Sequence, residues 1–477
     1  MSKTSVWEAT AEETSFPALA SDIAVDVAII GGGITGVTAA YLLSKAHQKV
    51  AVLEARKIGE GATGYSTGNL YAMVGSEGLH NVKSKWNEEV MKHVVASRAA
   101  AVDFIEGRVR EFQIDCDFRR VPWCLFTNND KQQSYIEKER EAAETTGLSI
   151  SSDIPFPLPW NHGFRIDNQA QFNPYAYVAG LARNIESDRC AIYENTKVIK
   201  VEEGEVCTVE TDSGVVTASQ VIMATHTPKG IYKVHTSLGP YRECAVAVRL
   251  NGAYPPPGTF WYMLETEHYS LRTYETPGGP VLMVLGETYK VGHGDNTEEK
   301  FRMLENFLRQ HFDVASVAYQ WAAQQYRPAD GIPYIGLSSG NEKTYIATGF
   351  AADGLTYGTL AAMIISDEIM GVENKWSKTY EASRTTPIAS AGAFIKENID
   401  VAAQYLKDIP GNVEAKDVEE IRPGEGKIIE SGGEKIAAYR DEQNDLHLCS
   451  AVCTHMDCIV NFNEAERSWD CPCHGSR

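Results

Sequence analysis

The stretch DVAIIGGGITGVTAAYLLSKAHQKVAVLE, from Asp26 to Glu54, decides the fold of the first half of the chain. A short apolar run leads into three glycines, a pattern with helical apolar spacing follows, and a second apolar run ends at Glu54. This order of strand, G-x-G-x-x-G, helix, strand and acidic residue is typical of a dinucleotide-binding unit. The sequence therefore predicts an α/β domain that binds a dinucleotide.

Each glycine of the motif has a predicted role. Gly31 permits the tight turn, Gly33 lets the backbone approach a pyrophosphate, and Gly36 lets the helix pack on the strand. The positive end of the helix favours the phosphate charge. Glu54 is predicted to accept hydrogen bonds from ribose hydroxyls. The motif alone does not distinguish FAD from NAD.

A loop of small and hydroxyl-bearing residues follows Glu54 and favours a long, extended cofactor. It reads GATGYSTGN over residues 61–69. Its amides and hydroxyls are placed to reach a pyrophosphate and a flavin ring, and the predicted contacts are Thr63, Gly64, Ser66 and Thr67. A flexible surface loop is the alternative that composition leaves open.

From Asp26 to Gly371 the chain resembles the D-amino acid oxidase-like FAD family, which contains glycine oxidase and sarcosine oxidase. The matching pieces are a strand at 195–201, VIMATH at 221–226, DGIPYIG at 330–336, YIATGF at 345–350 and a helix from about Tyr357 to Met370. The resemblance implies an α/β FAD-binding Rossmann-like domain with an interleaved α+β substrate domain. It also implies cofactor contacts at Val198, Ala224, Thr225, Gly349, Gly354, Leu355 and Thr356.

The predicted helix near Thr356 has a physical role in this resemblance. Its positive end points at the residues that precede it. In the family the pyrimidine end of the flavin lies there, and fixed dipoles stabilise the negative charge that gathers on reduction. Ordinary turn glycine is the alternative for Gly349 and Gly354.

The resemblance also implies an anchor for a substrate carboxylate. Members similar to glycine oxidase carry an arginine and a proline shortly before their Asp-Gly-x-Pro turn, and Arg327 with Pro328 precedes Asp330 here. A planar guanidinium suits a carboxylate. The intervening segment is shorter than in those members, so a solvated arginine is the alternative. No catalytic base is identified, because a neutral amine can give up hydride directly. The pocket candidates are Tyr262, His226 and Tyr326.

The last residues carry a second constellation. Cys453-Thr454-His455 is followed, after fifteen residues, by CPCHGSR at 471–477. Two cysteines and two histidines at this spacing are the ligand set of a Rieske [2Fe-2S] centre, with thiolates on one iron and imidazoles on the other. The predicted ligands are Cys453, His455, Cys471 and His474. A tetrahedral zinc site is the alternative, because zinc accepts the same ligands.

The segment 417–477 closely resembles a Rieske domain, which implies a small all-β module. In the respiratory-chain type, one extra cysteine in each cluster loop joins a disulfide, and Cys458 and Cys473 match these positions. Ser476 matches a hydroxyl that donates to a bridging sulfide in high-potential centres. Rieske domains continue through further strands and a proline-containing loop, so a chain that stops at Arg477 implies a truncated, incomplete module.

Length and charge set the organisation that we expect. A chain of 477 residues predicts at least two cores. The expected parts are an N-terminal arm (1–24), an FAD-dependent oxidoreductase domain (25–383) with its substrate subdomain at about 80–190 and 230–325, a connector (384–416) with a helix at 394–406, and the Rieske domain (417–477). The net charge of −20 argues against nucleic acid and anionic membrane surfaces.

The chain shows neither an apolar run that could cross a bilayer nor the apolar core of a signal peptide. We therefore expect a cytoplasmic protein without a transmembrane anchor and with a loose N-terminal arm. The scattered cysteines Cys116, Cys124, Cys190, Cys207 and Cys244 are expected to be reduced.

The combination resembles a bacterial family of FAD-dependent oxidoreductases with a C-terminal Rieske domain. It implies that FAD oxidises the CH–NH or CH–NH2 group of an amine or amino acid, and that the cluster passes electrons singly to an unknown acceptor. One alternative is an oxidase in which FAD reacts with O2 and the cluster is structural or vestigial. Another is a non-catalytic redox sensor. Membrane quinol chemistry fits the respiratory-type loops, but no anchor supports it.

Overall fold

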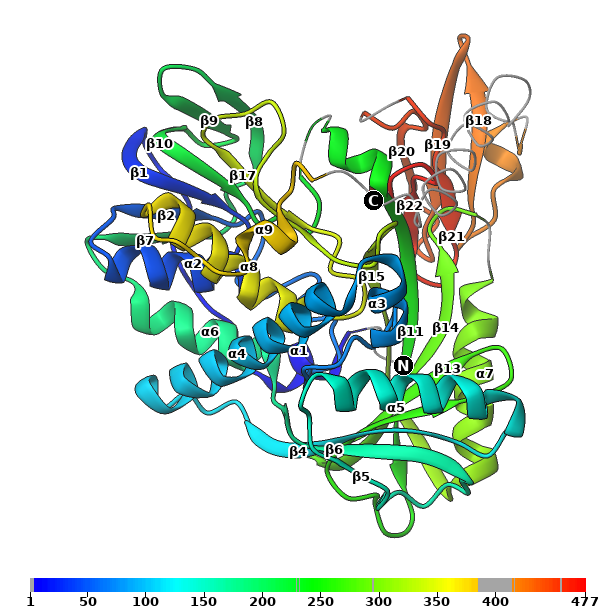
Figure 1. The fold of residues 1–477 in the computed structure, drawn as a ribbon. Helices are drawn as coiled ribbons and strands as arrows, with labels where there is room; N and C mark the ends of the chain where they lie inside the picture. Colours follow the sequence, from blue (N-terminus) through cyan, green and yellow to red (C-terminus); the bar gives the residue numbers. More distant parts are fainter. Residues whose placement is uncertain are drawn as a thin grey trace.

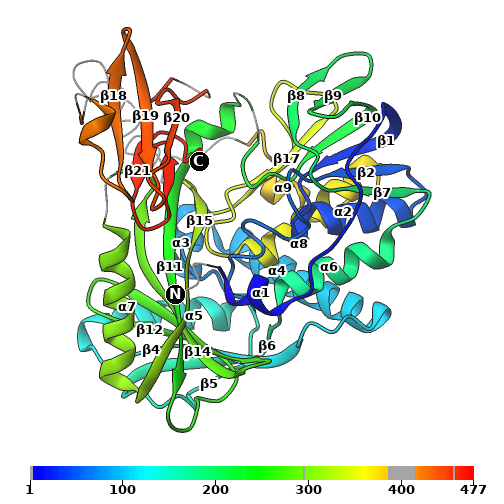
Figure 2. The same cartoon turned by 180° about the vertical axis from the view of Figure 1, so that it is seen from behind.

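Figures 1 and 2 show the fold in a computed structural model, which describes residues 4–228, 230, 232–293, 296–384, 414–415, 417–454 and 457–477. Two sheets face each other through helices and loops, and a small β module lies against one end of the second sheet. The predicted ligand His455 and the predicted connector helix at 394–406 lie outside the described residues.

The first sheet contains the unit predicted between Asp26 and Glu54. Its strand order is β16-β17-β10-β1-β2-β7, with β9 beside β10 and β8 beside β9. The strands are β1 (Ile23–Ile30), β2 (Val50–Leu53), β7 (Cys190–Tyr193), β8 (Val198–Glu203), β9 (Cys207–Thr211), β10 (Val215–Met223), β16 (Tyr334–Leu337) and β17 (Thr344–Thr348). β1 runs parallel to β2 and β10, and β10 runs parallel to β17. Their carboxyl ends therefore meet at one edge, where such sheets bind ligands.

Helices cover the first sheet and share one apolar core with it. They are α2 (Ile34–Lys45), α4 (Glu88–Phe112), α6 (Pro174–Ile185), α8 (Gly354–Ile369) and α9 (Ser377–Tyr380). α6 falls in the range predicted for the substrate subdomain, yet it packs against α2. Its apolar face, with Val178 and Leu181, belongs to the core of the first sheet.

The second sheet corresponds to the predicted substrate subdomain and is mostly antiparallel. Its order is β15-β11-β14-β13-β12-β4-β6-β3, with β5 beside β6. The strands are β3 (Asn69–Leu70), β4 (Arg119–Thr127), β5 (Ile150–Ser151), β6 (His162–Gln171), β11 (Leu238–Leu250), β12 (Thr259–Met263), β13 (His268–Thr276), β14 (Gly279–Lys290) and β15 (Val314–Pro328). The accompanying helices are α3 (Leu79–Lys85), α5 (Gln133–Thr145), α7 (Thr297–His311), η1 (Asp130–Gln132) and η2 (Lys233–Ser237). α7 packs on one face through Phe301, Leu304 and Leu308.

The N-terminal arm is packed from Thr4 onward, so the expectation of a loose arm is wrong for these residues. It forms α1 (Val6–Thr10), and the side chains of Val6 and Trp7 are fully buried. The Trp7 ring lies 4.6 Å from the ring of Tyr274, and the guanidinium of Arg272 lies 5.2 Å from the Trp7 ring. The buried Trp7 side chain contributes a large apolar contact area, which holds in place an arm whose composition is otherwise polar.

The C-terminal module is all-β, as predicted. β18 (Gly426–Ser431), β19 (Glu434–Arg440) and β20 (Leu446–Ser450) form an antiparallel sheet, β21 (Asn461–Asn463) pairs with β22 (Ser468–Asp470), and η4 spans Val418–Glu420. β18 and β19 form a hairpin whose turn is made by Gly432 and Gly433. In Figure 1 the module lies beside β11 and β14. Among the described residues, no helix is both long and apolar enough to cross a membrane.

Candidate functional site

The turn after β1 depends on approaches that only glycine permits. Gly31 has a φ of +108°, and a Cβ there would lie 2.5 Å from the carbonyl oxygen of Ala224. A Cβ on Gly36 would lie 1.9 Å from the carbonyl oxygen of Gly31. The amide of Ala224 also donates to the carbonyl oxygen of Ile30 at 2.9 Å. These contacts pack the end of β10 and the first turn of α2 directly against the glycine turn.

The N-terminus of α2 is open beside Gly33. Gly33 is the N-cap residue and makes no side-chain cap bond. A Cβ at Gly33 would meet only Thr63 Oγ1, at 3.1 Å, and that hydroxyl accepts from the amide of Ile34 at 3.1 Å. Because helix N-termini attract anions, this space suits a pyrophosphate, and the Thr63 hydroxyl lies beside it. The contact of Thr63 with the cofactor stays a prediction.

Glu54 turns back toward the glycine turn. Its carboxylate accepts from the amides of Gly32 at 2.7 Å and Arg56 at 2.9 Å. Burial raises the pKa of Glu54. Two carboxylate oxygens can accept more than two hydrogen bonds, so room remains for a ribose hydroxyl. That contact stays a prediction.

The loop at 61–69 is anchored by side chains from outside the dinucleotide unit. The bonds are Trp7 Nε1 to the carbonyl oxygen of Ser66 at 2.6 Å, Trp321 Nε1 to that of Tyr65 at 2.9 Å, and Arg272 Nη1 to that of Thr67 at 2.7 Å. Burial lowers the pKa of Arg272 to about 9. The alternative of a flexible surface loop therefore does not describe this structure.

α8 starts at Gly354, one of the predicted cofactor contacts. A Cβ on Gly358, one turn later, would lie 2.6 Å from Thr35 Oγ1, so the first turns of α8 and α2 touch. Gly349 follows β17 with a φ of +76°. Two helix N-termini thus meet at one edge of the first sheet, where their dipoles add.

The remaining predicted FAD contacts are spread along the first sheet. Val198 is the first residue of β8, and Leu355 and Thr356 are buried in the first turn of α8. Thr225 directs its hydroxyl to the carbonyl oxygen of Thr227 at 2.7 Å. The structure brings Ala224 against Gly31, while Val198 lies on the β8–β9 pair. Taken together, the open helix termini and the glycine turn fit an FAD molecule.

Arg327 lies half-buried near the end of β15. Its guanidinium lies 4.6 Å from the Tyr241 ring centroid and donates to Thr288 Oγ1 at 3.4 Å. Burial raises the pKa of Glu243 to about 7, against the lowering effect of the Arg327 charge. The alternative of a solvated arginine is not observed, because Arg327 is packed on Tyr241. Its role as an anchor stays a prediction.

A cavity of about 220 Å³ lies among α3, α5 and strands β4, β12 and β13. Its lining includes Trp123, Trp261, His268 and Glu77. Burial, with a smaller effect of the Arg327 charge, lowers the pKa of His268 to about 4. The cavity is therefore lined by aromatic side chains and a neutral imidazole, and the Arg327 charge acts on that imidazole.

Tyr262 does not line this cavity, nor do the other two pocket candidates, His226 and Tyr326, so their role in a substrate pocket stays a prediction. The Tyr262 ring lies 5.2 Å from that of Phe126 and 6.2 Å from that of Phe307. Successive side chains of a strand point to opposite faces, and Trp261 takes the cavity side. Tyr262 therefore packs under α7.

Three of the predicted cluster ligands are described, and they lie together. Cys453 and Cys471 are buried in one apolar cluster, and their thiols are within hydrogen-bonding range. His474 is half-buried, with its ring 5.8 Å from that of His235. Two buried sulfurs and an imidazole nearer the surface fit the donor set of a Rieske centre.

Two loops carry these ligands and are linked covalently. The amide of Cys453 donates to the carbonyl oxygen of Cys458 at 2.9 Å, and the amide of Gly475 donates to that of Cys471 at 3.0 Å. Cys458 and Cys473 form a disulfide bond with a Cα–Cα distance of 6.6 Å, which confirms the predicted pairing. The Ser476 carbonyl oxygen accepts from the Cys471 amide at 2.8 Å. Its predicted hydroxyl bond to a sulfide stays a prediction.

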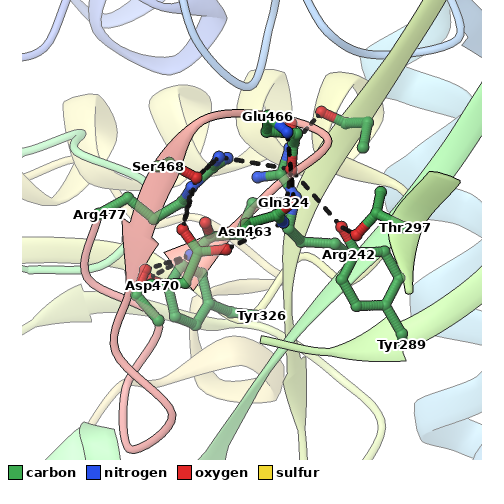
Figure 3. Close-up of polar contacts among 12 residues, drawn as sticks. Arg242, Tyr289, Thr297, Gln324, Tyr326, Asn463, Glu466, Ser468, Asp470 and Arg477 are labelled. Atoms are coloured by element: carbon green, nitrogen blue, oxygen red, sulfur yellow. Dashed lines mark hydrogen bonds and ion pairs between the residues drawn. The ribbon is translucent and has the colours of Figure 1, made fainter. Parts of the chain in front are cut away.

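The module is fixed on the second sheet by polar side chains, which Figure 3 shows. Arg242 of β11, 3% exposed at its side chain, forms an ion pair with Glu466. A Cβ on Gly292, just after β14, would lie 2.6 Å from the amide nitrogen of Pro472. Asn461 Nδ2 donates to the carbonyl oxygen of Gly292 at 2.6 Å. The second cluster loop therefore contacts the second sheet directly.

The family model described as FAD dependent oxidoreductase matches residues 26–368, the region that holds both sheets. The chain belongs to the FAD dependent oxidoreductase family. A second model, the Rieske [2Fe-2S] domain, matches residues 411–477. The protein is therefore an FAD-dependent oxidoreductase with a C-terminal Rieske domain, and its cofactors are FAD and a [2Fe-2S] cluster.

Similar proteins match either the whole chain or its oxidoreductase domain alone. The Rieske 2Fe-2S iron-sulfur protein YhfW of Bacillus subtilis is 32% identical over 99% of this chain and 93% of its own length. The gamma-glutamylputrescine oxidoreductase of Escherichia coli is 26% identical over 75% of this chain and 86% of its own length. The crystal structure of glycine oxidase from Geobacillus kaustophilus has a TM-score of 0.60 at 18% identity and covers 76% of this chain and 99% of its own.

Sequence reasoning missed a buried ion pair beside α8 of the oxidoreductase. Arg98 Nη1 lies 3.4 Å from Asp353 Oδ2, and both side chains are essentially unexposed. Asp353 also accepts from the amide of Gly75 at 3.2 Å, and the Arg98 guanidinium lies 4.4 Å from the Tyr357 ring. The sequence signal for this ion pair was the charge of Asp353 within the otherwise small and apolar run FAADGLT at 350–356. The docking pair Arg242–Glu466 offered no local signal.

Proposed function

We propose that this oxidoreductase takes a hydride from an amine or amino acid with FAD as the acceptor and passes the electrons singly through the Rieske centre to an external one-electron acceptor. The observation that carries the proposal is the contact between the two halves. The Tyr326 hydroxyl at the end of β15 donates to the carbonyl oxygen of the predicted ligand His474 at 3.1 Å. Tyr326 lies on the second sheet, and its carbonyl oxygen accepts from the amide of Ala351 at 3.0 Å, close to the predicted flavin contacts. A cluster loop bonded to Tyr326 is therefore suited to exchange electrons with the flavin.

The residues proposed to hold FAD lie at the edge where α2 and α8 begin. Gly33 and the α2 N-terminus would face the pyrophosphate, and Glu54 would accept from the ribose. The α8 N-terminus at Gly354 would face the pyrimidine end of the ring. When bound, FAD supplies the hydride acceptor that side chains lack.

The substrate class rests on Arg327 and on the relatives. Proteins named glycine oxidase and gamma-glutamylputrescine oxidoreductase are similar to this chain over about three quarters of its length. Arg327 would bind an α-carboxylate through two parallel hydrogen bonds. Burial raises the pKa of Glu243 to about 7 against the lowering effect of the Arg327 charge, so carboxylate binding at Arg327 would depend on pH near neutrality.

Anaerobic reduction tests the relay. We expect an amine or amino acid from a panel to bleach the flavin absorption and then to produce the EPR signal of the reduced cluster. If substrate bleaches the flavin while the cluster stays oxidised, an O2-using oxidase with a structural cluster is the better description. If dithionite reduces both centres and no amine does, the redox-sensor alternative gains support.

A variant separates the two substrate classes. Arg327→Lys keeps the charge but loses the bidentate fork, so the concentration of an α-amino acid needed for half-maximal flavin reduction should rise about 10- to 100-fold. Amines without a carboxylate should be affected little. Equal effects on both classes would show that Arg327 does not bind the carboxylate.

A further inference from the structure

The end of β15 meets the second cluster loop through two side chains, Gln324 and Tyr326 (Figure 3). Tyr326 is buried, and its hydroxyl donates to the carbonyl oxygen of His474 at 3.1 Å. Gln324 Nε2 donates to the carbonyl oxygen of Gly475 at 2.8 Å and to the Tyr326 hydroxyl at 2.9 Å. Residues two apart on a strand share a face, so both side chains reach the loop together.

The other side of Tyr326 contacts the flavin-binding half. Its carbonyl oxygen accepts from the amide of Ala351, between the predicted flavin contacts Gly349 and Gly354, at 3.0 Å. The His226 ring lies 4.8 Å from the Tyr326 ring in an edge-to-face arrangement. His226 follows Ala224 and Thr225 directly, so it extends from the turn that packs on the dinucleotide motif.

The backbone of His226 is held in a conformation that is uncommon for its residue type. Its φ is +69°, and its carbonyl oxygen accepts from the Thr348 hydroxyl at 2.8 Å. A non-glycine residue in this region costs free energy, and such residues gather at functional sites. Here the conformation goes together with the packing of the imidazole on the Tyr326 ring.

The cluster loop is fixed against the same strands by close backbone packing. A Cβ on Gly475 would lie 2.7 Å from Pro240 Cβ, and Gly475 has a φ of +69°. Gly292 approaches Pro472 as closely from the end of β14. The loop can therefore shift little relative to Tyr326, and the distance between the two halves is set by rigid elements.

We propose that His226 and Tyr326 form the route by which electrons leave the flavin site for the cluster, with Gln324 as the positioning residue that holds the His474–Gly475 backbone on it. The proposal rests on the relay proposed above. The route is short: an aromatic contact from His226 to Tyr326, then one hydrogen bond to a residue that carries a cluster ligand.

The electron balance fixes how the route is used. Oxidation of an amine to an imine breaks one C–H and one N–H bond, forms a C=N bond and releases two electrons and two protons. The cluster accepts one electron at a time, so each turnover needs two passages along the route. Two molecules of an oxidised one-electron carrier take these electrons, and the two protons go to solvent.

Photoreduction tests the route without relying on the substrate. The protein with both cofactors is kept anaerobic, a light-driven reductant delivers electrons to the flavin, and the rate of cluster reduction is followed by absorption and EPR. In Tyr326→Phe the rate should fall about tenfold or more, because the variant loses the hydrogen bond that joins the aromatic ring to the cluster loop, while the rigid packing keeps the loop in place. His226→Gly, which tolerates the positive φ, should also slow it.

Two controls make the result specific. Tyr319→Phe, a change of the same kind elsewhere on β15, should leave the rate unchanged. The midpoint potentials of both cofactors should be unaltered in Tyr326→Phe. A wild-type rate in both Tyr326→Phe and His226→Gly overturns the route, as does a slower rate that follows a changed potential, because driving force alone then explains it. If Tyr326→Phe fails to fold, His226→Gly decides alone.

The outcomes separate this inference from the proposed function. If light-driven transfer is fast and sensitive to Tyr326 while no amine reduces the flavin, the route stands and the substrate assignment fails. If the wild-type cluster is never reduced from the flavin, both fail.

Discussion

The glycine turn after β1 and the interface beneath the cluster loops hold their cofactor sites by different means. The turn is made of backbone approaches between near neighbours, such as Gly36 to Gly31. The interface is made of side chains that meet across large separations, 148 residues from Tyr326 to His474 and 224 from Arg242 to Glu466. The backbone approaches at the turn exclude any side chain larger than glycine, whereas the side-chain contacts at the interface can be removed one at a time by substitution.

The largest effect is expected at the turn. Gly36→Ala would place a Cβ 1.9 Å from the carbonyl oxygen of Gly31, and no rotamer change relieves a clash with backbone. Overpacking of this kind should cost more than about 3 kcal/mol and abolish flavin binding. Flavin content and thermal unfolding measure the two effects.

Gly107→Ala in α4, where a Cβ meets nothing within 4 Å, is the matched control and should stabilise the helix by up to about 1 kcal/mol. Full flavin content in Gly36→Ala would contradict the comparison.

The next effect is expected at the interface. Arg242→Met leaves Arg477 Nη2, at 3.3 Å, as the remaining cation beside Glu466, so the docked module should be destabilised by about 3 kcal/mol, the low end for breaking a buried pair. The double variant Arg242→Met with Glu466→Leu should recover much of this loss, because no unpaired charge remains. Protease resistance of the module and urea unfolding report it.

A surface pair in the same module provides the control for that prediction. Arg467 and Glu442 are 48% and 53% exposed, so Arg467→Ala should cost less than about 1 kcal/mol. Equal costs at positions 242 and 467 would show that the interface pair does not hold the module.

A third effect separates covalent from non-covalent support of the cluster loops. Replacing Cys458 and Cys473 together by alanine opens a loop of 15 residues, which should destabilise the module by about 3 kcal/mol. Flavin binding in the other half should be unchanged. Cys449→Ala, at an exposed free cysteine, should have little effect. Unfolding with and without a thiol reductant gives a second measurement, because the wild type and Cys449→Ala should respond to the reductant and the double alanine variant should not.

The difference between the two regions also explains what the sequence allowed us to predict. The motif from Gly31 to Glu54 predicted the turn, the helix and the adjoining strands, because those contacts depend on local spacing. The Cys and His spacing likewise predicted the grouping of Cys453, Cys471 and His474, whereas the disulfide was implied by the resemblance to the respiratory-chain type. Local spacing says nothing about which sheet the module meets.

The misses follow the same physical division. The packing of Trp7 depends on Tyr274 and Arg272, which are far away in the sequence. Trp261 lines the cavity, whereas its neighbour Tyr262, the residue named from the sequence, packs under α7, because a shift of one residue along a strand reverses the face. The contacts of Gln324 and Tyr326 with the cluster loop join residues 151 and 148 positions apart in the sequence and depend on how the module docks on the second sheet. No short pattern encodes that docking.

The smallest effect is expected one residue beyond Arg242, where the two regions meet. Arg242 is paired across the interface, whereas burial raises the pKa of its neighbour Glu243 to about 7. The native state then holds more protons than the unfolded chain between pH 4.5 and about 7, so stability falls as pH rises through this window. Glu243→Gln removes this loss, and its advantage over the wild type in the free energy of unfolding should grow by about 2 kcal/mol from pH 5.5 to 8. Urea midpoints at both pH values measure it, with the exposed Glu430→Gln as the control. If the free energies of unfolding of Glu243→Gln and wild type change in parallel with pH, the Arg327 charge outweighs the effect of burial on the Glu243 pKa. Glu243 would then be stabilised by a nearby cation, as Glu466 is by Arg242 at the interface.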